Sequence, residues 1–272
     1  MSQLDVEWVA FRAGLKPALR LNASAAEAPA MAARYRATGA HVAEAAGSVK
    51  SAAERRVLLY VAHSREAAEA LRAAEAPTLQ GEGVCEREQS IRCARRTGEL
   101  LGYPRCCVEA FCARMQRGIG RLGDGGQAAE LYVAAAEAWR DRPQPWLNNL
   151  RRPERCQLVS FEPCGYDCAA ALAQAGRCRL AAQAIDAEGT RELERALGEP
   201  VAIAASGARA IVTLAEGRIV HAVAAAGAAG GSVEDRALGE QLLWTVVSAA
   251  GVVPCGDGPP VVVCDFSRVV PS

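Results

Sequence analysis

Two short clusters of cysteines are the residues of this chain best suited to chemistry. Cys106 and Cys107 are adjacent and follow a Gly-Tyr-Pro turn, and Cys164 and Cys168 stand four residues apart about fifty residues later. Thiolates are soft ligands that bind zinc and iron–sulfur centres. If the two clusters meet in space, their four thiolates can close a tetrahedral zinc site or ligate a [4Fe–4S] cluster.

The residue spacing favours the iron–sulfur alternative. Adjacent helical positions diverge by about 100°, which disfavours binding of one small ion by both members of a Cys-Cys pair. The Cys-x-x-Cys spacing of zinc knuckles is absent, and so are the radical-SAM and ferredoxin spacings. We therefore expect a [4Fe–4S] centre, with structural zinc, thiol or persulfide redox chemistry, or simply buried cysteines as the alternatives.

A helix is expected from Pro104 onward. The spacing of its apolar residues separates the cysteine expected in the core from those expected as ligands. An apolar stripe at i, i+3, i+4 and i+7 predicts the packed face, formed by Val108, Phe111, Cys112 and Met115. Cys112 is therefore expected in the core, with a lesser role as a substitute ligand. Cys106 and Cys107 lie off the stripe at the helix N-terminus, where free N–H groups and the helix dipole stabilise a thiolate.

Three carboxylates lie nearest to the cysteines in sequence and are candidate acids or bases: Glu109, Glu162 and Asp167. Each of them is also compatible with an ordinary solvated acid. If only three cysteines bind, one iron stays open to a substrate. The arginines gathered at 87–121 and 140–155 favour a small anionic substrate, or form a solvated face. The few aromatic residues among them (Tyr103, Phe111 and Trp146) do not form an interleaved stacking pattern, which argues against nucleic acid as a partner.

The pattern of apolar residues predicts a mixed α+β fold that is largely helical in its N-terminal two-thirds. A short strand–helix unit is expected at 57–62 and from Ser64. Helices are expected within 24–54, at 86–101, 127–140 and 166–175, and a short strand at 158–161.

The composition shifts near Gly198, which suggests domains at 1–198 and 199–272. The second is expected to be a small module of a hairpin (210–214 and 218–223), a helix (233–250) and a strand (261–264). This C-terminal module could serve as a homodimer contact.

The double-cysteine run at 101–111, with Pro163-Cys164 and Cys168, resembles the archaeal and bacterial family catalogued as domain of unknown function 483. Segments 14–17 and 60–75 are similar as well, so the resemblance covers roughly residues 5–185. Where many relatives carry a histidine before the Pro-Cys, this chain has Phe161 and Glu162. The resemblance implies a cysteine-rich centre and brings no activity with it.

The composition of the whole chain indicates the compartment and the class of protein. Lys+Arg and Asp+Glu are both 31, so no net charge points to nucleic acid or membrane. Eleven cysteines, no signal-peptide pattern and no long apolar run favour a cytoplasmic protein whose thiols are reduced. We thus expect a cytoplasmic iron–sulfur protein, an enzyme acting on a small anion as lyase, sulfur-handling enzyme or oxidoreductase. The alternative is a zinc-stabilised binding or scaffold module without catalysis.

Overall fold

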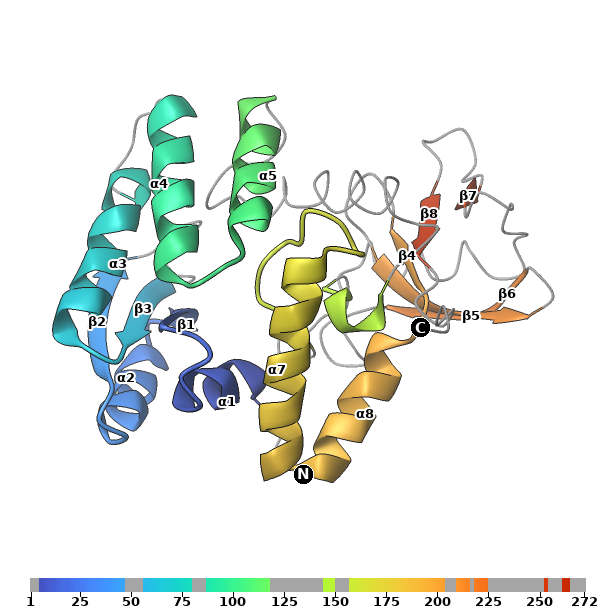
Figure 1. Ribbon diagram of the computed structural model, residues 1–272, viewed down its shortest axis with the longest axis horizontal. Helices are drawn as coiled ribbons and strands as arrows, with labels where there is room; N and C mark the ends of the chain where they lie inside the picture. Colours follow the sequence, from blue (N-terminus) through green and yellow to red (C-terminus); the bar gives the residue numbers. More distant parts are fainter. Residues whose placement is uncertain are drawn as a thin grey trace. The chain divides into compact units, whose positions relative to one another are not determined.

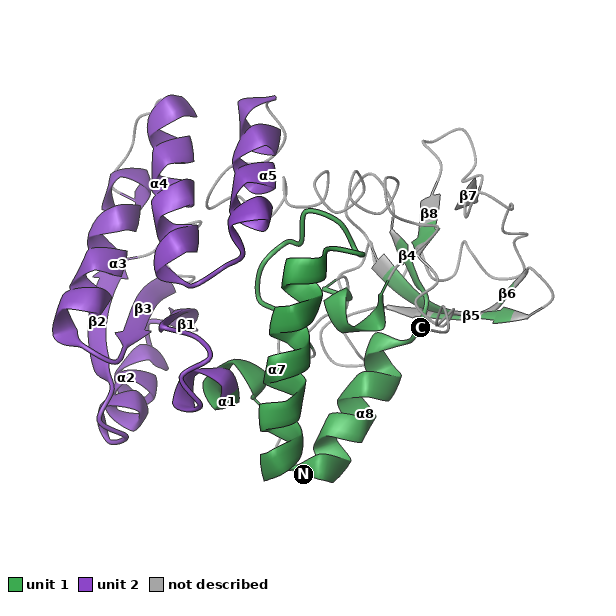
Figure 2. Ribbon diagram, in the orientation of Figure 1, with its two compact units in different colours: residues 1–9, 124–272 green, residues 10–123 purple. Residues whose placement is uncertain are grey.

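The computed structural model describes residues 5–46, 56–79, 87–117, 144–149, 157–203, 209–215, 218–224, 252–253 and 261–264 (Figure 1). The chain forms two compact units, which are coloured in Figure 2. Unit 2 comprises residues 10–123, and unit 1 comprises residues 1–9 and 124–272. The boundary between the two units, after residue 9, falls inside helix α1 (Val6–Arg12).

Unit 2 is built on a three-stranded antiparallel sheet of order β1-β3-β2. The strands are β1 (Ala18–Ser24), β2 (His41–Ala46) and β3 (Arg56–Ala62). Side chains alternate between the two faces of a strand. Leu59 accordingly packs with Ala28 and Ala32 of α2 (Ala28–Arg36), whereas its neighbours Leu58 and Tyr60 belong to the cluster that contains Leu71 of α3 (Arg65–Leu79).

Helices α4 (Arg87–Leu100) and α5 (Arg105–Gln116) form a hairpin in the same unit. The predicted stripe of α5 is confirmed, because Val108, Cys112 and Met115 are buried together with Ile91 and Ala94 of α4, and Phe111 packs against them. The two helices approach closely at Gly98. A Cβ added there would lie 2.8 Å from a Val108 methyl group.

The turn between α4 and α5 depends on Gly102, which has a φ of 73°. A Cβ at this position would also lie 2.6 Å from Cδ of Pro17. The turn therefore needs glycine both for its left-handed backbone and for its close approach to the 14–17 segment. It leads directly into the first turn of α5.

Gly102→Ala is expected to destabilise the protein more than the matched change Gly14→Ala. Gly14 also has a positive φ, but nothing lies within 4 Å of a Cβ added there. Gly14→Ala should cost about 1–2 kcal/mol through backbone strain alone, and Gly102→Ala about 1–3 kcal/mol more through the clash with Pro17. Urea unfolding of both variants measures the difference, and equal losses would disprove the contact.

The described part of unit 1 includes helices α7 (Ala169–Ile185) and α8 (Ala187–Leu197) and the short 3-10 helix η2 (Pro145–Leu147). Arg179 on α7 lies over the Trp146 ring, 5.0 Å from its centroid, and pairs with Glu194 of α8 at 3.3 Å. The Nδ2 of Asn148 donates to the carbonyl of Leu197 at 2.8 Å. These contacts fix the segment after η2 against α7 and α8.

A five-stranded antiparallel sheet of order β6-β5-β4-β8-β7 completes unit 1. Its strands are β4 (Val201–Ile203), β5 (Arg209–Ala215), β6 (Arg218–Ala224), β7 (Val252–Val253) and β8 (Val261–Cys264). The predicted hairpin at 210–223 is confirmed as β5 and β6, and the predicted strand at 261–264 as β8.

The mixed α+β class is confirmed, but two local predictions are wrong, the helix throughout 24–54 and the strand at 158–161. The stretch 24–54 is not uniformly helical, because β2 follows α2 and pairs with β3. Residues 158–161 are buried or half-buried without forming a strand, and the expected helix at 166–175 is the longer α7. The predicted helices at 127–140 and 233–250 lie outside the described residues, and the division into domains at 1–198 and 199–272 stays a prediction.

Among the residues that the structure describes, no helix is long and apolar enough to cross a membrane.

Candidate metal centre

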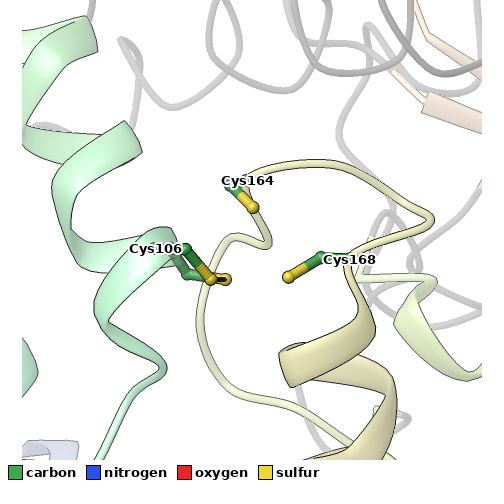
Figure 3. Close-up of side chains that lie close together, drawn as sticks. Cys106, Cys164 and Cys168 are labelled. Carbon is green, nitrogen blue, oxygen red and sulfur yellow. Dashed lines mark hydrogen bonds between the residues drawn. The ribbon is translucent and has the colours of Figure 1, made fainter.

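The four cysteines predicted as ligands lie together in the structure. The Sγ atoms of Cys106, Cys107, Cys164 and Cys168 are all within 4.8 Å of one another. Figure 3 shows the side chains of Cys106 on α5, Cys164 on the loop before α7 and Cys168 at the start of α7 converging on one point. Four thiol groups at this spacing can bind a metal ion.

Cys106 and Cys107 occupy the first turn of α5, whose N-cap residue is Pro104. The backbone N–H of Cys107 donates to the carbonyl of Pro104 at 2.9 Å, which begins the helix. The two Sγ atoms are 3.9 Å apart, although the residues are adjacent. The expectation that neighbouring cysteines diverge too far for one ion therefore does not hold at this helix start, because tetrahedral Zn–S bonds of about 2.3 Å place sulfur atoms about 3.8 Å apart.

Cys164 and Cys168 form a turn-into-helix clip, one of the two arrangements that their spacing allowed. Cys168 is the N-cap residue of α7 with extended backbone angles, and Cys164 lies in the turn before it. The Cys168 N–H donates to the carbonyl of Gly165 at 3.1 Å, and the N–H of Leu172 donates to the Cys168 carbonyl at 2.9 Å. These backbone bonds set the spacing of the pair.

Both pairs therefore sit at the positive end of a helix. Neither α5 nor α7 has an acidic residue in its first turn, where Asp and Glu commonly occur. Cys106 and Cys107 stand in the first turn of α5 instead, and Cys168 is the N-cap residue of α7. Cys107 is buried, Cys164 and Cys168 are half-buried, and Cys106 is exposed.

Cys112, the possible substitute ligand, lies outside the group. Its Sγ donates to the carbonyl of Ile91 at 3.8 Å within the α4–α5 core. Burial raises the pKa of the Cys112 thiol, and the nearby Arg95 only partly offsets this effect. Cys112 is therefore held as a neutral thiol, which suits a packing role better than a ligand role.

The three candidate acids lie in different surroundings. Glu109 is exposed on α5 and accepts two hydrogen bonds from Arg95, both at 2.9 Å. Glu162 is half-buried, and Asp167 is exposed in the turn that precedes α7. The hydrogen bonds from Arg95 lower the pKa of Glu109, so this residue is a carboxylate at neutral pH and could act only as a base or as an ion-pair partner.

Arg95→Ala is expected to raise the pKa of Glu109 to that of an ordinary glutamate. The lowered pKa means that the pair contributes stability above the pKa of an unfolded glutamate and loses it as the pH falls through the folded value. NMR titration of the Glu109 carboxyl measures the shift. Arg96→Ala is the control, because Arg96 pairs with Glu99. An unchanged Glu109 pKa in Arg95→Ala would contradict the assigned cause.

Comparison with protein-family models, with curated proteins and with solved structures found no match for this chain. The description of the centre therefore rests on its own residues.

Sequence reasoning found the four cysteines but missed a buried polar group elsewhere in unit 2. Hydrogen bonds join the Glu75 carboxylate of α3 to Arg20 and Tyr60 of the sheet. Glu75 is 55 residues from Arg20 and lies in an alanine-rich helix, so only the pairing of strands with α3 brings the two charges together. No local pattern in the sequence indicates this contact.

Proposed function

We propose that Cys106, Cys107, Cys164 and Cys168 bind one metal ion as a tetrathiolate, and that the ion is zinc. The observation that carries the proposal is the mutual distance of the four Sγ atoms, all within 4.8 Å. A tetrahedral zinc site needs sulfur–sulfur distances of about 3.8 Å, and the Cys106–Cys107 distance is 3.9 Å. In a [4Fe–4S] cluster each thiolate binds a different iron, so the sulfur atoms lie farther apart.

A zinc ion with four protein ligands has no open position for substrate, so its role is structural. Binding releases the thiol protons and couples the free energy of metal binding to that of folding. Such a site requires reduced cysteines, which fits a cytoplasmic location. On this proposal the protein is a zinc-stabilised binding module, and its ligand is bound away from the metal.

The second candidate is a [4Fe–4S] enzyme acting on a small anionic substrate. It is favoured by the exposure of Cys106 and by the absence of Cys-x-x-Cys pairs among the ligands. Loss of the exposed ligand would open one iron to substrate, with Glu162 or Asp167 as the nearest acid or base in sequence. The resemblance to the family of unknown function adds no activity to either candidate.

Metal analysis of anaerobically purified protein separates the two candidates. The zinc proposal predicts about one zinc per chain and a colourless protein. A brown protein with iron and acid-labile sulfide would replace it by the second candidate. A protein that takes up neither metal after anaerobic reconstitution would overturn both.

A further inference from the structure

The buried polar group of unit 2 contains an arginine that is anchored at one end only. Arg20 lies on β1 directly opposite Tyr60 of β3. Its Nε donates to both carboxylate oxygens of Glu75, at 2.6 and 2.8 Å, and the Tyr60 hydroxyl donates to the same carboxylate at 2.6 Å. Glu75 and Tyr60 are fully buried. The Arg20 side chain is therefore held firmly in one position.

The other end of the guanidinium has no polar partner among the described residues. The two Nη groups carry most of the N–H donors of an arginine, and they make no hydrogen bond or ion pair to any described residue. The Arg20 side chain is 31% exposed. An arginine held at Nε with its Nη edge open has the geometry that binds a carboxylate or phosphate through two parallel hydrogen bonds.

Unit 2 also holds the buried positive charge of Lys16. Lys16 is only 5% exposed, and its Nζ lies 5.7 Å from the centroid of the Tyr103 ring. Tyr103 is also close enough to influence Arg20. Burial lowers the pKa of Arg20, but Glu75, with contributions from Tyr60 and Tyr103, raises it by more, so Arg20 stays fully charged. Positive charge in a partly buried place favours an anion, since solvent screens it weakly.

We infer that Arg20, held by Glu75 at its Nε and partly exposed, forms a binding site for the oxyanion group of a small molecule. The shared chemistry is a carboxylate or a phosphate, bound by the two Nη groups of Arg20. Lys16, whose Nζ lies 5.7 Å from the centroid of the Tyr103 ring, adds positive potential to the same unit. The site lies within unit 2 and does not depend on the metal centre.

Titration calorimetry on the full chain tests this site. The probes are inorganic phosphate, succinate and acetate, each against sodium chloride at equal ionic strength. We expect saturable binding of phosphate or a carboxylate, and the stronger probe identifies the class of ligand. Arg20→Lys keeps the positive charge beside Glu75 but removes the two Nη groups. The affinity for the bound anion should therefore fall by about tenfold or more.

The control is Arg36→Lys, because Arg36 is an exposed arginine of the same unit that pairs with Glu44. It should leave the affinity unchanged. If Arg20→Lys folds poorly, binding is measured in the wild-type protein instead. Addition of the anion should then shift the NMR signal of the Arg20 Nε–H. The inference is overturned if no probe binds above the chloride control, or if Arg20→Lys binds as tightly as the wild type. Either result leaves the zinc proposal untouched, because the metal is measured separately.

Discussion

Cys107→Ala is expected to abolish stoichiometric zinc binding. The variant removes one of four thiolates from the group, and even the loss of a group that only supports a metal ligand weakens zinc binding by about 10–100-fold. Loss of a ligand should therefore cost more than about 100-fold. Thermal unfolding should shift downward as well, because the metal no longer contributes to folding. Competition with a chromogenic chelator measures the affinity.

Cys112→Ala is the matched control for this experiment. Both cysteines lie on α5 and are almost completely buried, at 2% for Cys107 and 1% for Cys112. Both variants should lose a similar amount of packing, but Cys112→Ala should keep its zinc. On α7, Cys178→Ala is the control for Cys168→Ala, since Cys178 is a buried residue in the middle of the helix. Zinc loss in the Cys112 variant would contradict the assigned ligand set.

Glu75→Ala is expected to destabilise unit 2 strongly. The Glu75 carboxylate accepts hydrogen bonds from Arg20 and Tyr60 while being only 1% exposed. Its removal leaves a partly buried guanidinium and a fully buried hydroxyl without an acceptor. Breaking a buried ion pair in this way costs about 3–5 kcal/mol. Since Arg20 is partly exposed, we expect about 3 kcal/mol, measured by urea unfolding.

Glu44→Ala is the control for the Glu75 variant. Glu44 pairs with Arg36 at 2.8 Å, but both side chains are about half exposed. Exposed pairs contribute about 0–1 kcal/mol. Similar losses in the two glutamate variants would show that burial of the Arg20–Glu75 pair does not determine its strength. The same comparison measures how firmly Arg20 is held for the proposed oxyanion site.

The position of each cysteine pair could be predicted because its signal is local. Proline and glycine place Cys106 and Cys107 at a helix start, and the apolar stripe of α5 separates them from Cys112. The turn-into-helix geometry of Cys164 and Cys168 could also be anticipated from the sequence. In each case residues within one or two helical turns decide the outcome.

The wrong predictions concern segments whose structure is decided by distant partners. The alanine-rich segment 41–46 has high helix propensity, but it pairs with β3 along its whole length as β2. Leu158 and Val159 are buried without a strand partner, so an apolar run there indicates burial only. The Arg20–Glu75 pair is formed by residues 55 positions apart. None of these outcomes can be derived from neighbouring residues.

X-ray absorption spectroscopy at the metal edge tests the central claim most directly. For one zinc bound by Cys106, Cys107, Cys164 and Cys168, the spectrum should fit four sulfur atoms at about 2.3 Å, with no metal–metal scattering. An iron–iron shell would show that the cysteines hold a cluster. Nitrogen or oxygen atoms in place of sulfur would show that the four cysteines are not the ligands, and either result would contradict the tetrathiolate centre.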